Sequence, residues 1–431
     1  MSAIAKVLIH NNVKVSGSDS GSSKITEELK GLGAEIFKGH DASNIKSPDL
    51  VVYTAAVKDD NPELMRAREL GIETVARAEM LGRIMKNYKK AISVAGTHGK
   101  TTATSMMTYV LMKALLDPTV MVGGELDIID GNFRIGKSEY FLTESCEYCR
   151  SFLSFFPTVG IILNVEEDHL DYYKDIDDIK SAFSDFANLI PKDGVLVVCA
   201  EGENGADCVQ STKAKPIFYG FEKGDYQARN ISFDDFGYPT FDVYKDGEKL
   251  ITLTLSVVGR HNVLNATGIL ATALAMGIEL DAIKAGLEAF SGTKRRFEKK
   301  GYCNGALIVD DYAHHPTEIE ATFASVKKTK HNTVWCIFQP HTYTRTKALF
   351  GDFARVLSKV DRVIITDIYA AREKDTGLVS AKQLADAIPD SRYIPDFEDI
   401  ASFIKSVAQK GDIIITMGAG NVVNIGDMIK D

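Results

Sequence analysis

Residues 91–107 read AISVAGTHGKTTATSMM, and the rest of the chain is organised around this stretch. The apolar run 91–95 has the length of a buried strand, 96–99 is a turn with two glycines, and Lys100 opens a segment that reads as a helix through Met112. A strand, a glycine turn and a helix that begins with Lys-Thr are typical of a phosphate-binding loop. The glycines let backbone N–H groups approach phosphate oxygens, and the helix N-terminus adds partial positive charge.

The side chains of this loop have the chemistry that a nucleotide needs. We expect Lys100 to reach the terminal phosphates and the Thr101 hydroxyl to bind Mg²⁺. The loop is shorter than the common pattern, because Val94 stands where that pattern has its first glycine. The alternative, an ordinary strand-to-helix turn that carries a lysine, is less favoured. The predicted ATP-binding residues of the loop are Gly96, Thr97, His98, Gly99, Lys100, Thr101 and Thr102.

Length and composition indicate a soluble protein with several domains. The chain of 431 residues is too long for one core, and 45% hydrophobic and 25% charged residues are ordinary values. No apolar run is long enough to cross a bilayer and no secretory signal is present, so we expect a cytoplasmic protein without membrane insertion. The net charge of −9 and the lack of a basic block argue against a nucleic-acid partner. Cys146 and Cys149 form one Cys-x-x-Cys pair, for which two partly buried thiols are favoured over a metal or redox site.

The first 88 residues are predicted to form a domain with a parallel sheet, because strand-like runs alternate with helical stretches. Ligands of such sheets bind beyond the carboxyl ends of the strands. Asp19, Thr54 and Ala56 follow predicted strands and are candidate substrate-binding residues; for the neighbouring Ser18 and Lys58 a plain turn role is equally open. The chain opens on a helical pattern without the preceding strand and glycine turn, so we expect the sheet to lack its first strand.

Residues 89–293 are predicted to form a central domain around the phosphate loop. Predicted strands at 139–144 and 159–164 both end in acidic sequence. A parallel sheet would bring these ends to the same edge as the loop. Glu144 and Thr101 are therefore expected to share a Mg²⁺ ion, since Mg²⁺ prefers oxygen ligands.

Two further signals follow in this domain. Residues 226–255 read as a β-hairpin added to the main sheet, with an Asp-Gly turn at 246–247. A helix then begins near 260, where Asn262 and Asn265 lie three residues apart on one face. Their amides are suited to a base edge, and helix capping by Asn262 is a comparable alternative.

Residues 294–431 are predicted to form a last domain after a positively charged hinge at 292–297. Its predicted strands each end in polar, His-rich or Gly-rich sequence, so that their ends can form one binding rim. These strands are 307–311, 334–338, 363–366 and 413–416.

Taken together, these motifs resemble the Mur ligase family over nearly the whole chain. The stretches 310–316 (DDYAHHP) and 338–345 (FQPHTYTR) are the most discriminating, and they are similar to the members that add alanine. The other similar motifs are 96–102 (nucleotide loop), Glu144, Asn164 and 168–171 (metal-binding segments), 261–266 (adenine side) and 295–297 (interdomain arginine).

The resemblance implies an α/β, three-domain architecture. It comprises an N-terminal Rossmann-like sheet, a central P-loop ATPase-like sheet with an added hairpin, and a C-terminal Rossmann-like domain. It also implies a ligase reaction in peptidoglycan precursor synthesis: ATP activates the lactyl carboxylate of UDP-N-acetylmuramate as an acyl phosphate, which the amine of L-alanine attacks.

The resemblance further implies roles for individual residues. The implied catalytic residues are Lys100, Glu144, His169, Arg296 and Asp311. Thr101 and Glu144 would hold one metal ion and His169 would lie near a second, for which Mn²⁺ is also suitable because imidazole is an unusual Mg²⁺ ligand. The remaining implied residues are His261, Asn262 and Asn265 for ATP, and His315, Tyr343 and Arg345 for L-alanine, with Arg345 forming a fork to its carboxylate.

One departure from the family concerns the N-terminus. Relatives have a strand and a Gly-Ile-Gly-Gly-Ile-Gly turn ahead of the residues that match Met1-Ser2, and that turn is expected to bind the uridine diphosphate. A misplaced start codon or a trimmed chain is the preferred explanation. Two alternatives stay open: a sibling ligase that recycles murein tripeptide, and a nucleotide-binding protein that is inactive because this glycine loop is absent.

Overall fold

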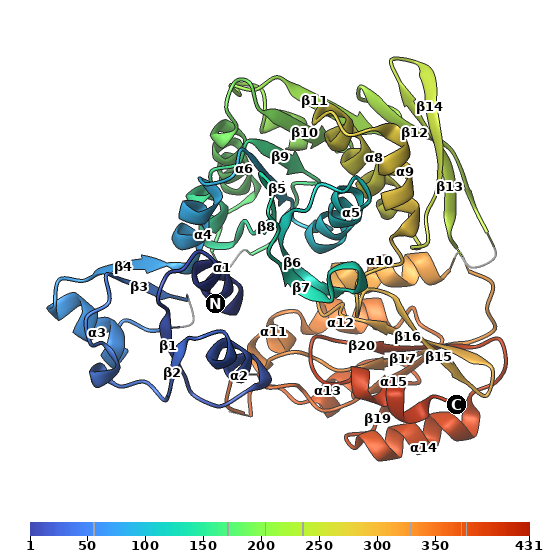
Figure 1. The fold of residues 1–431 in the computed structure, drawn as a ribbon. Coiled ribbons are helices and arrows are strands. Elements are labelled where there is room, and N and C mark those ends of the chain that lie inside the picture. The colour runs from blue at the N-terminus through green and yellow to red at the C-terminus, as the bar shows by residue number, and fades with distance from the viewer. Residues whose placement is uncertain are drawn as a thin grey trace. The chain divides into compact units, whose positions relative to one another are not determined.

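The computed structural model describes residues 1–54, 57–169, 172–202, 204–234, 237–327, 329–371, 373–375 and 377–431. The chain divides into two compact units, and Figure 1 labels its helices and strands. The first comprises residues 1–123, 127–227 and 265–286, and the second comprises 124–126, 228–264 and 287–431. No helix in the described part of the chain is long and apolar enough to cross a membrane.

The N-terminal part of the first unit alternates helices with short parallel strands, as predicted. β1 (Ser16–Asp19) pairs with β2 (Glu35–Lys38), and β3 (Leu50–Tyr53) pairs with β4 (Glu73–Ala76). These strands form two separate two-stranded sheets and not one continuous sheet, because β1 and β3 are not hydrogen-bonded to each other. The helices between and around them are α1 (Ser2–His10), α2 (Lys24–Gly31), η1 (Ala42–Asn44), α3 (Pro62–Glu69) and α4 (Arg77–Met85).

The main sheet contains ten strands in the order β14-β13-β12-β11-β10-β9-β5-β8-β6-β7. β5 lies between β8 and β9 and runs parallel to both, and its residues after Lys90 are buried. Ala95 pairs with Ser145 on one side and Ile162 on the other, so that the three strands end level. The first eight of these strands in the chain are β5 (Lys90–Ala95), β6 (Thr119–Leu126), β7 (Gly131–Arg134), β8 (Tyr140–Ser145), β9 (Val159–Ile162), β10 (Val195–Cys199), β11 (Pro216–Gly220) and β12 (Tyr226–Phe233).

A β-hairpin forms one end of this sheet, and seven helical segments of the described chain belong to the same region. The hairpin of β13 (Pro239–Lys245) and β14 (Glu248–Thr254) is antiparallel, which confirms the prediction. Its turn residues Asp246 and Gly247 have φ of 52° and 85°, as a two-residue type I′ turn requires. The helices of this region are α5 (Lys100–Lys113), η2 (Asp127–Ile129), η3 (Tyr148–Ser154), α6 (Ile176–Leu189), α7 (Asn204–Asp207), α8 (Arg260–Ala275) and α9 (Leu280–Ala289).

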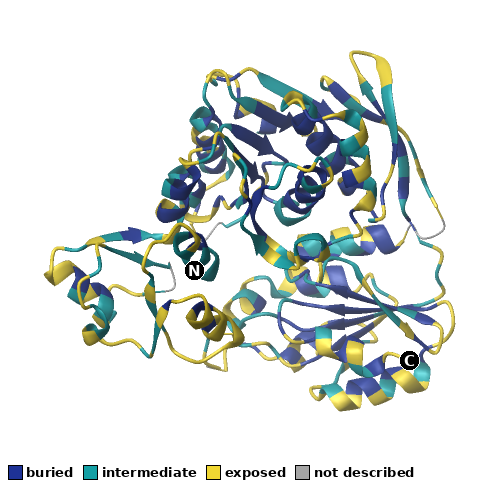
Figure 2. Cartoon of the chain, viewed as in Figure 1, coloured by how far each residue is buried: buried dark blue, intermediate teal, exposed yellow. Residues whose placement is uncertain are grey.

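The C-terminal part of the second unit contains a six-stranded sheet in the order β15-β16-β20-β17-β18-β19. Alternate residues of its central strands enter two different apolar clusters, as expected for a sheet covered on both faces, and Figure 2 shows these strands as buried. The strands are β15 (Glu298–Cys303), β16 (Ala306–Asp311), β17 (Val334–Phe338), β18 (Arg362–Ile365), β19 (Arg392–Tyr393) and β20 (Ile413–Met417). The helices are α10 (Pro316–Val326), α11 (Tyr343–Ala348), α12 (Phe350–Leu357), α13 (Ala381–Asp386), α14 (Phe397–Val407) and α15 (Val423–Ile429).

Candidate active site

The predicted phosphate loop connects the buried end of β5 to the first turn of α5. Gly96 and Gly99 have φ of 149° and 82°, which side chains rarely allow. A Cβ on Gly96 would lie 2.9 Å from Leu163 Cβ, so the loop passes very close to the segment after β9. Gly99 caps α5, and Lys100, Thr101 and Thr102 form its first turn. The loop therefore presents the N-terminus of a 14-residue helix, which favours anions.

Asn164 fixes the shape of this loop. Its side-chain oxygen accepts from the backbone N–H of His98 at 2.8 Å, and its side-chain amide donates to the His98 carbonyl at 3.0 Å. Its own carbonyl accepts from the Thr97 N–H at 3.2 Å. The Thr97 hydroxyl in turn accepts from the Glu166 N–H at 2.9 Å. The loop conformation is therefore held by the segment that follows β9.

Thr101 and Glu144 lie together, as the sequence predicts. The Thr101 hydroxyl donates to Glu144 Oε2 at 3.0 Å, and the Gly123 N–H donates to Glu144 Oε1 at 2.5 Å. Two oxygen ligands thus stand side by side at the mouth of the loop. This donor set fits Mg²⁺, which binds carboxylate and hydroxyl oxygens and keeps several waters.

Lys100 contacts a residue that the sequence reasoning missed. Its ammonium donates to the carbonyls of Gly96 and Thr97, with Nζ–O distances of 2.5 and 3.0 Å. It also contacts both carboxylate oxygens of Glu147, at 2.9 and 3.1 Å. The Glu147 side chain is only 3% exposed. The signal for Glu147 was its position three residues after Glu144, just beyond the same strand end.

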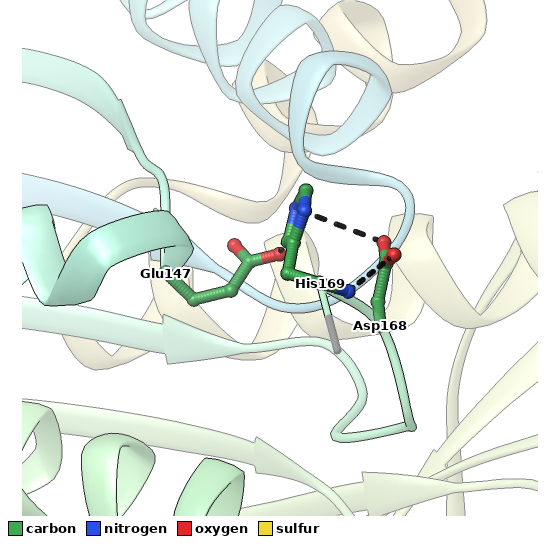
Figure 3. Close-up of side chains that lie close together, drawn as sticks. All are labelled: Glu147, Asp168 and His169. Atoms are coloured by element: carbon green, nitrogen blue, oxygen red, sulfur yellow. Dashed lines mark hydrogen bonds and ion pairs between the residues drawn. The ribbon is translucent and has the colours of Figure 1, made fainter. Parts of the chain in front are cut away.

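Glu147 also faces His169, as Figure 3 shows with Asp168. His169 Nε2 lies 3.7 Å from Glu147 Oε1 and 3.8 Å from Asp168 Oδ2. His169 has a left-handed backbone with φ of 54°, which is uncommon for residues other than glycine, although histidine adopts it more often than most. One ligand atom from each of the three residues lies within 4.8 Å of the others. The arrangement is chemically suited to a second divalent ion beside the loop.

The predicted adenine-side residues begin α8, and the boundary between the two units falls within this helix. Asn265 lies beside the phosphate loop, because a Cβ on Gly99 would be 3.2 Å from its Oδ1. The Asn262 amide donates to the Val258 carbonyl at 2.8 Å and so stabilises the start of the helix. His261 packs near Gly259, where a Cβ would lie 2.6 Å from its ring.

In the second unit, the hinge residues are fixed to the end of β16. Arg295 and Phe297 have φ of 63° and 52°, both in the left-handed region. Arg295 Nε donates to the fully buried Asp310 at 3.1 Å, and the Phe297 N–H donates to Asp311 at 3.0 Å. The Arg296 guanidinium lies 5.5 Å from the Tyr312 ring centroid. The hinge backbone is therefore anchored, and the Arg296 side chain projects from it.

Burial raises the pKa of Asp311 to about 6, against an ordinary value of 3.8, although the Arg296 charge opposes the shift. Between about pH 4 and 6 the folded carboxyl therefore binds more protons than the unfolded one, so stability falls as the pH rises through this window. The difference of about two pKa units corresponds to about 3 kcal/mol.

We therefore expect the stability difference between wild type and Asp311→Asn to shift by about 3 kcal/mol in favour of the variant from pH 4 to pH 7. Urea unfolding followed by fluorescence measures it, because the single tryptophan, Trp335, lies in the same sheet as Asp311. A difference that is constant with pH would contradict a raised pKa.

The rim of the six-stranded sheet brings two histidines to Arg345. Arg345 donates to His341 Nδ1 at 3.0 Å, and the rings of His341 and His314 lie 5.8 Å apart. Glu318 lies 3.4 Å from His314. Burial lowers the pKa of both histidines, which favours neutral rings. Sequence reasoning named Arg345 but missed His314 and His341, although both follow predicted strands.

Two other predicted alanine-binding residues belong to the starts of helices. His315 precedes α10, and its Nδ1 lies 2.6 Å from the Thr317 hydroxyl. Tyr343 opens α11, and its N–H donates to Glu373 at 2.7 Å. His315 is therefore oriented by its own helix turn, whereas the adjacent His314 joins Arg345 and His341.

The predicted substrate residues of the N-terminal part lie at strand ends. Asp19 ends β1, and its carboxylate accepts from the Gly21 N–H at 3.0 Å. Thr54 follows β3, and its carbonyl accepts from the Val57 N–H at 2.9 Å. Ala56 lies outside the described residues.

Three family models match the chain in order. They are "Mur ligase family, catalytic domain" at residues 1–89, "Mur ligase middle domain" at 94–273 and "Mur ligase, glutamate ligase domain" at 295–420. Together they span nearly all of the chain.

Curated relatives and solved structures agree with these matches. A UDP-N-acetylmuramate–L-alanine ligase of Clostridium novyi is 50% identical over 435 residues, which cover 100% of this chain and 95% of the relative. The ligase of the same name from Clostridium tetani is 52% identical over 432 residues, 99% of this chain and 95% of the relative. The crystal structure of UDP-N-acetylmuramate-alanine ligase from Thermotoga maritima matches with a TM-score of 0.82 at 30% identity, over 100% of this chain and 95% of that one. A murein peptide ligase from Psychrobacter arcticus matches with a TM-score of 0.72 at 26% identity and the same coverage.

Proposed function

The chain belongs to the Mur ligase family, and from this premise we propose that it joins L-alanine to the lactyl carboxylate of UDP-N-acetylmuramate with the energy of ATP. The proposal rests chiefly on sequence identity: about half of the residues, over the full chain, are identical to those of ligases of that name. The murein tripeptide ligase is less favoured, because a structure of that type is only 26% identical. A nucleotide-binding protein without turnover is likewise not favoured.

Phosphoryl transfer is mainly a task of positioning and charge neutralisation, and the loop residues suit it. The N-terminus of α5 and the ammonium of Lys100 would hold the β- and γ-phosphates of ATP. Thr101 and Glu144 would hold a Mg²⁺ ion, with His169 near a second ion that is either Mg²⁺ or Mn²⁺. Such an ion neutralises charge on the phosphates and the attacking carboxylate. The carboxylate of the sugar nucleotide attacks the γ-phosphorus and ADP leaves.

The second step needs an oriented amino acid. We assign L-alanine to the rim around Arg345, because a guanidinium forms a fork with a carboxylate. Neutral His314 and His341 lie beside it and line the place where the amine would approach. The amine attacks the acyl phosphate carbonyl and phosphate leaves. Arg296 belongs to the hinge that precedes this rim, and Asp311 ends β16 and accepts from the backbone of that hinge at Phe297.

The test is ADP release by the purified chain with ATP, Mg²⁺ and UDP-N-acetylmuramate. We expect release that depends on L-alanine and that L-alanyl-γ-D-glutamyl-diaminopimelate does not support. Release with the tripeptide alone would favour the recycling ligase. ATP binding without any release would favour a protein that has lost turnover.

A further inference from the structure

Every hydrogen-bond donor of the Lys100 ammonium is already used. Lys100 has three N–H groups, and its partners are the carbonyls of Gly96 and Thr97 and the carboxylate of Glu147. To contact a phosphate, the ammonium must give up at least one of them. The two carbonyls belong to the loop itself, so Glu147 is the charged partner of Lys100 among the residues that the structure describes.

The backbone of Glu147 is anchored by two hydrogen bonds. The Tyr173 hydroxyl donates to the backbone carbonyl of Glu147 at 2.5 Å, and the backbone N–H of Arg150 donates to the same oxygen at 2.8 Å. The Arg150 side chain is paired in turn with Asp178 at 2.7 Å and Asp185 at 3.2 Å, both on α6. When the pair opens, the flexible lysine side chain therefore moves and the backbone of Glu147 does not.

A bound nucleotide and Glu147 would compete for the same cation. The carboxylate is only 3% exposed, so solvent and salt screen its repulsion of phosphate weakly. A buried carboxylate is also costly without a partner, which makes its pairing with Lys100 stabilising in the nucleotide-free protein. His169 Nε2 lies 3.7 Å from the same carboxylate and stays beside it once the lysine has left.

We infer that Glu147 is a built-in counter-ion of the loop lysine, which holds Lys100 in the nucleotide-free protein and which the phosphates must displace. The inference rests on the proposed nucleotide function of the loop. Its consequence is a nucleotide affinity lower than the loop alone would give, because part of the binding energy opens the Lys100–Glu147 pair. Glu147 is a positioning residue in this account.

Calorimetric titration with ADP, in EDTA and without divalent ions, tests this competition. We expect Glu147→Gln to bind ADP about tenfold more tightly than wild type, because the amide keeps the shape but loses the charge. Glu167→Gln is the matched control: it removes the same charge from an exposed residue, and we expect a change of less than twofold. Equal or weaker ADP binding by Glu147→Gln would overturn the inference. Absence of ADP binding by wild type even with Mg²⁺ would instead contradict the proposed function.

A second measurement uses the wild-type chain and does not depend on a folded variant. Acetylation of lysines by a water-soluble ester, followed by mass spectrometry, reports how available each ammonium is. We expect Lys100 to react at least tenfold more slowly than the exposed Lys113 on the same helix without nucleotide. Equal reaction of Lys100 and Lys113 in wild type would show that the pair does not hold the lysine.

Discussion

Lys100→Met is expected to lower kcat for alanine-dependent ADP release about 100- to 1000-fold. The ammonium would neutralise charge that develops on the transferred phosphoryl group, and removal of one such group commonly costs about 3 to 4 kcal/mol of barrier. The measurement is steady-state ADP release at saturating UDP-N-acetylmuramate and L-alanine. Undiminished turnover would contradict the assignment of the loop.

The controls for this variant separate chemistry from folding. Lys113→Met removes an exposed lysine from the far end of the same helix and should leave kcat unchanged within about twofold. Lys100→Met leaves the Glu147 carboxylate buried without its partner, which by itself destabilises the fold. The double variant Lys100→Met/Glu147→Gln removes both charges, so it should regain the lost thermal stability without regaining activity.

Arg345→Met is expected to raise the KM for L-alanine about 100-fold and to leave the KM for ATP unchanged. A charge-assisted fork between guanidinium and carboxylate is worth about 2 to 5 kcal/mol when one partner is removed. Arg345→Lys keeps the charge but loses the planar fork. Its KM for L-alanine should therefore lie between those of wild type and Arg345→Met. The measurement is the dependence of ADP release on L-alanine concentration.

An exposed arginine provides the comparison for Arg345. Arg355 on α12 pairs with Asp352, and both side chains are more than half exposed. Arg355→Met should change neither KM, because exposed ion pairs contribute little. An unchanged KM for L-alanine in Arg345→Met would move the amino-acid site away from this rim.

The parts of the site that follow a regular pattern could be predicted from the sequence. The pairing of Thr101 with Glu144 follows from two rules: strands of a parallel sheet end at one edge, and a helix starts just beyond the glycine turn. The Asp-Gly turn at 246–247 likewise determines its hairpin, because both residues must take positive φ.

The positions of Glu147, His314 and His341 were not predicted, because they depend on irregular backbone that the periodic patterns of helices and strands do not describe. Glu147 points at Lys100 because the chain after β8 is irregular, with left-handed Cys149 and Arg150, and is tied to α6 through Arg150. Which of His314 and His315 lies beside Arg345 depends on how the chain turns after β16. Glu318 fixes this turn, because its carboxylate accepts from the backbone N–H groups of both histidines in a local capping contact at the start of α10.

The amide of Asn164 has a consequence for the thermodynamics of binding. Because this one side chain matches both the N–H and the carbonyl of His98, the loop reaches its working shape when the protein folds. An arriving triphosphate meets a rigid receptor and loses little affinity to the ordering of main chain. Aspartate at 164 has nearly the same size but no hydrogen-bond donor. It would leave the His98 carbonyl without the hydrogen bond from residue 164 and make the phosphate loop more flexible.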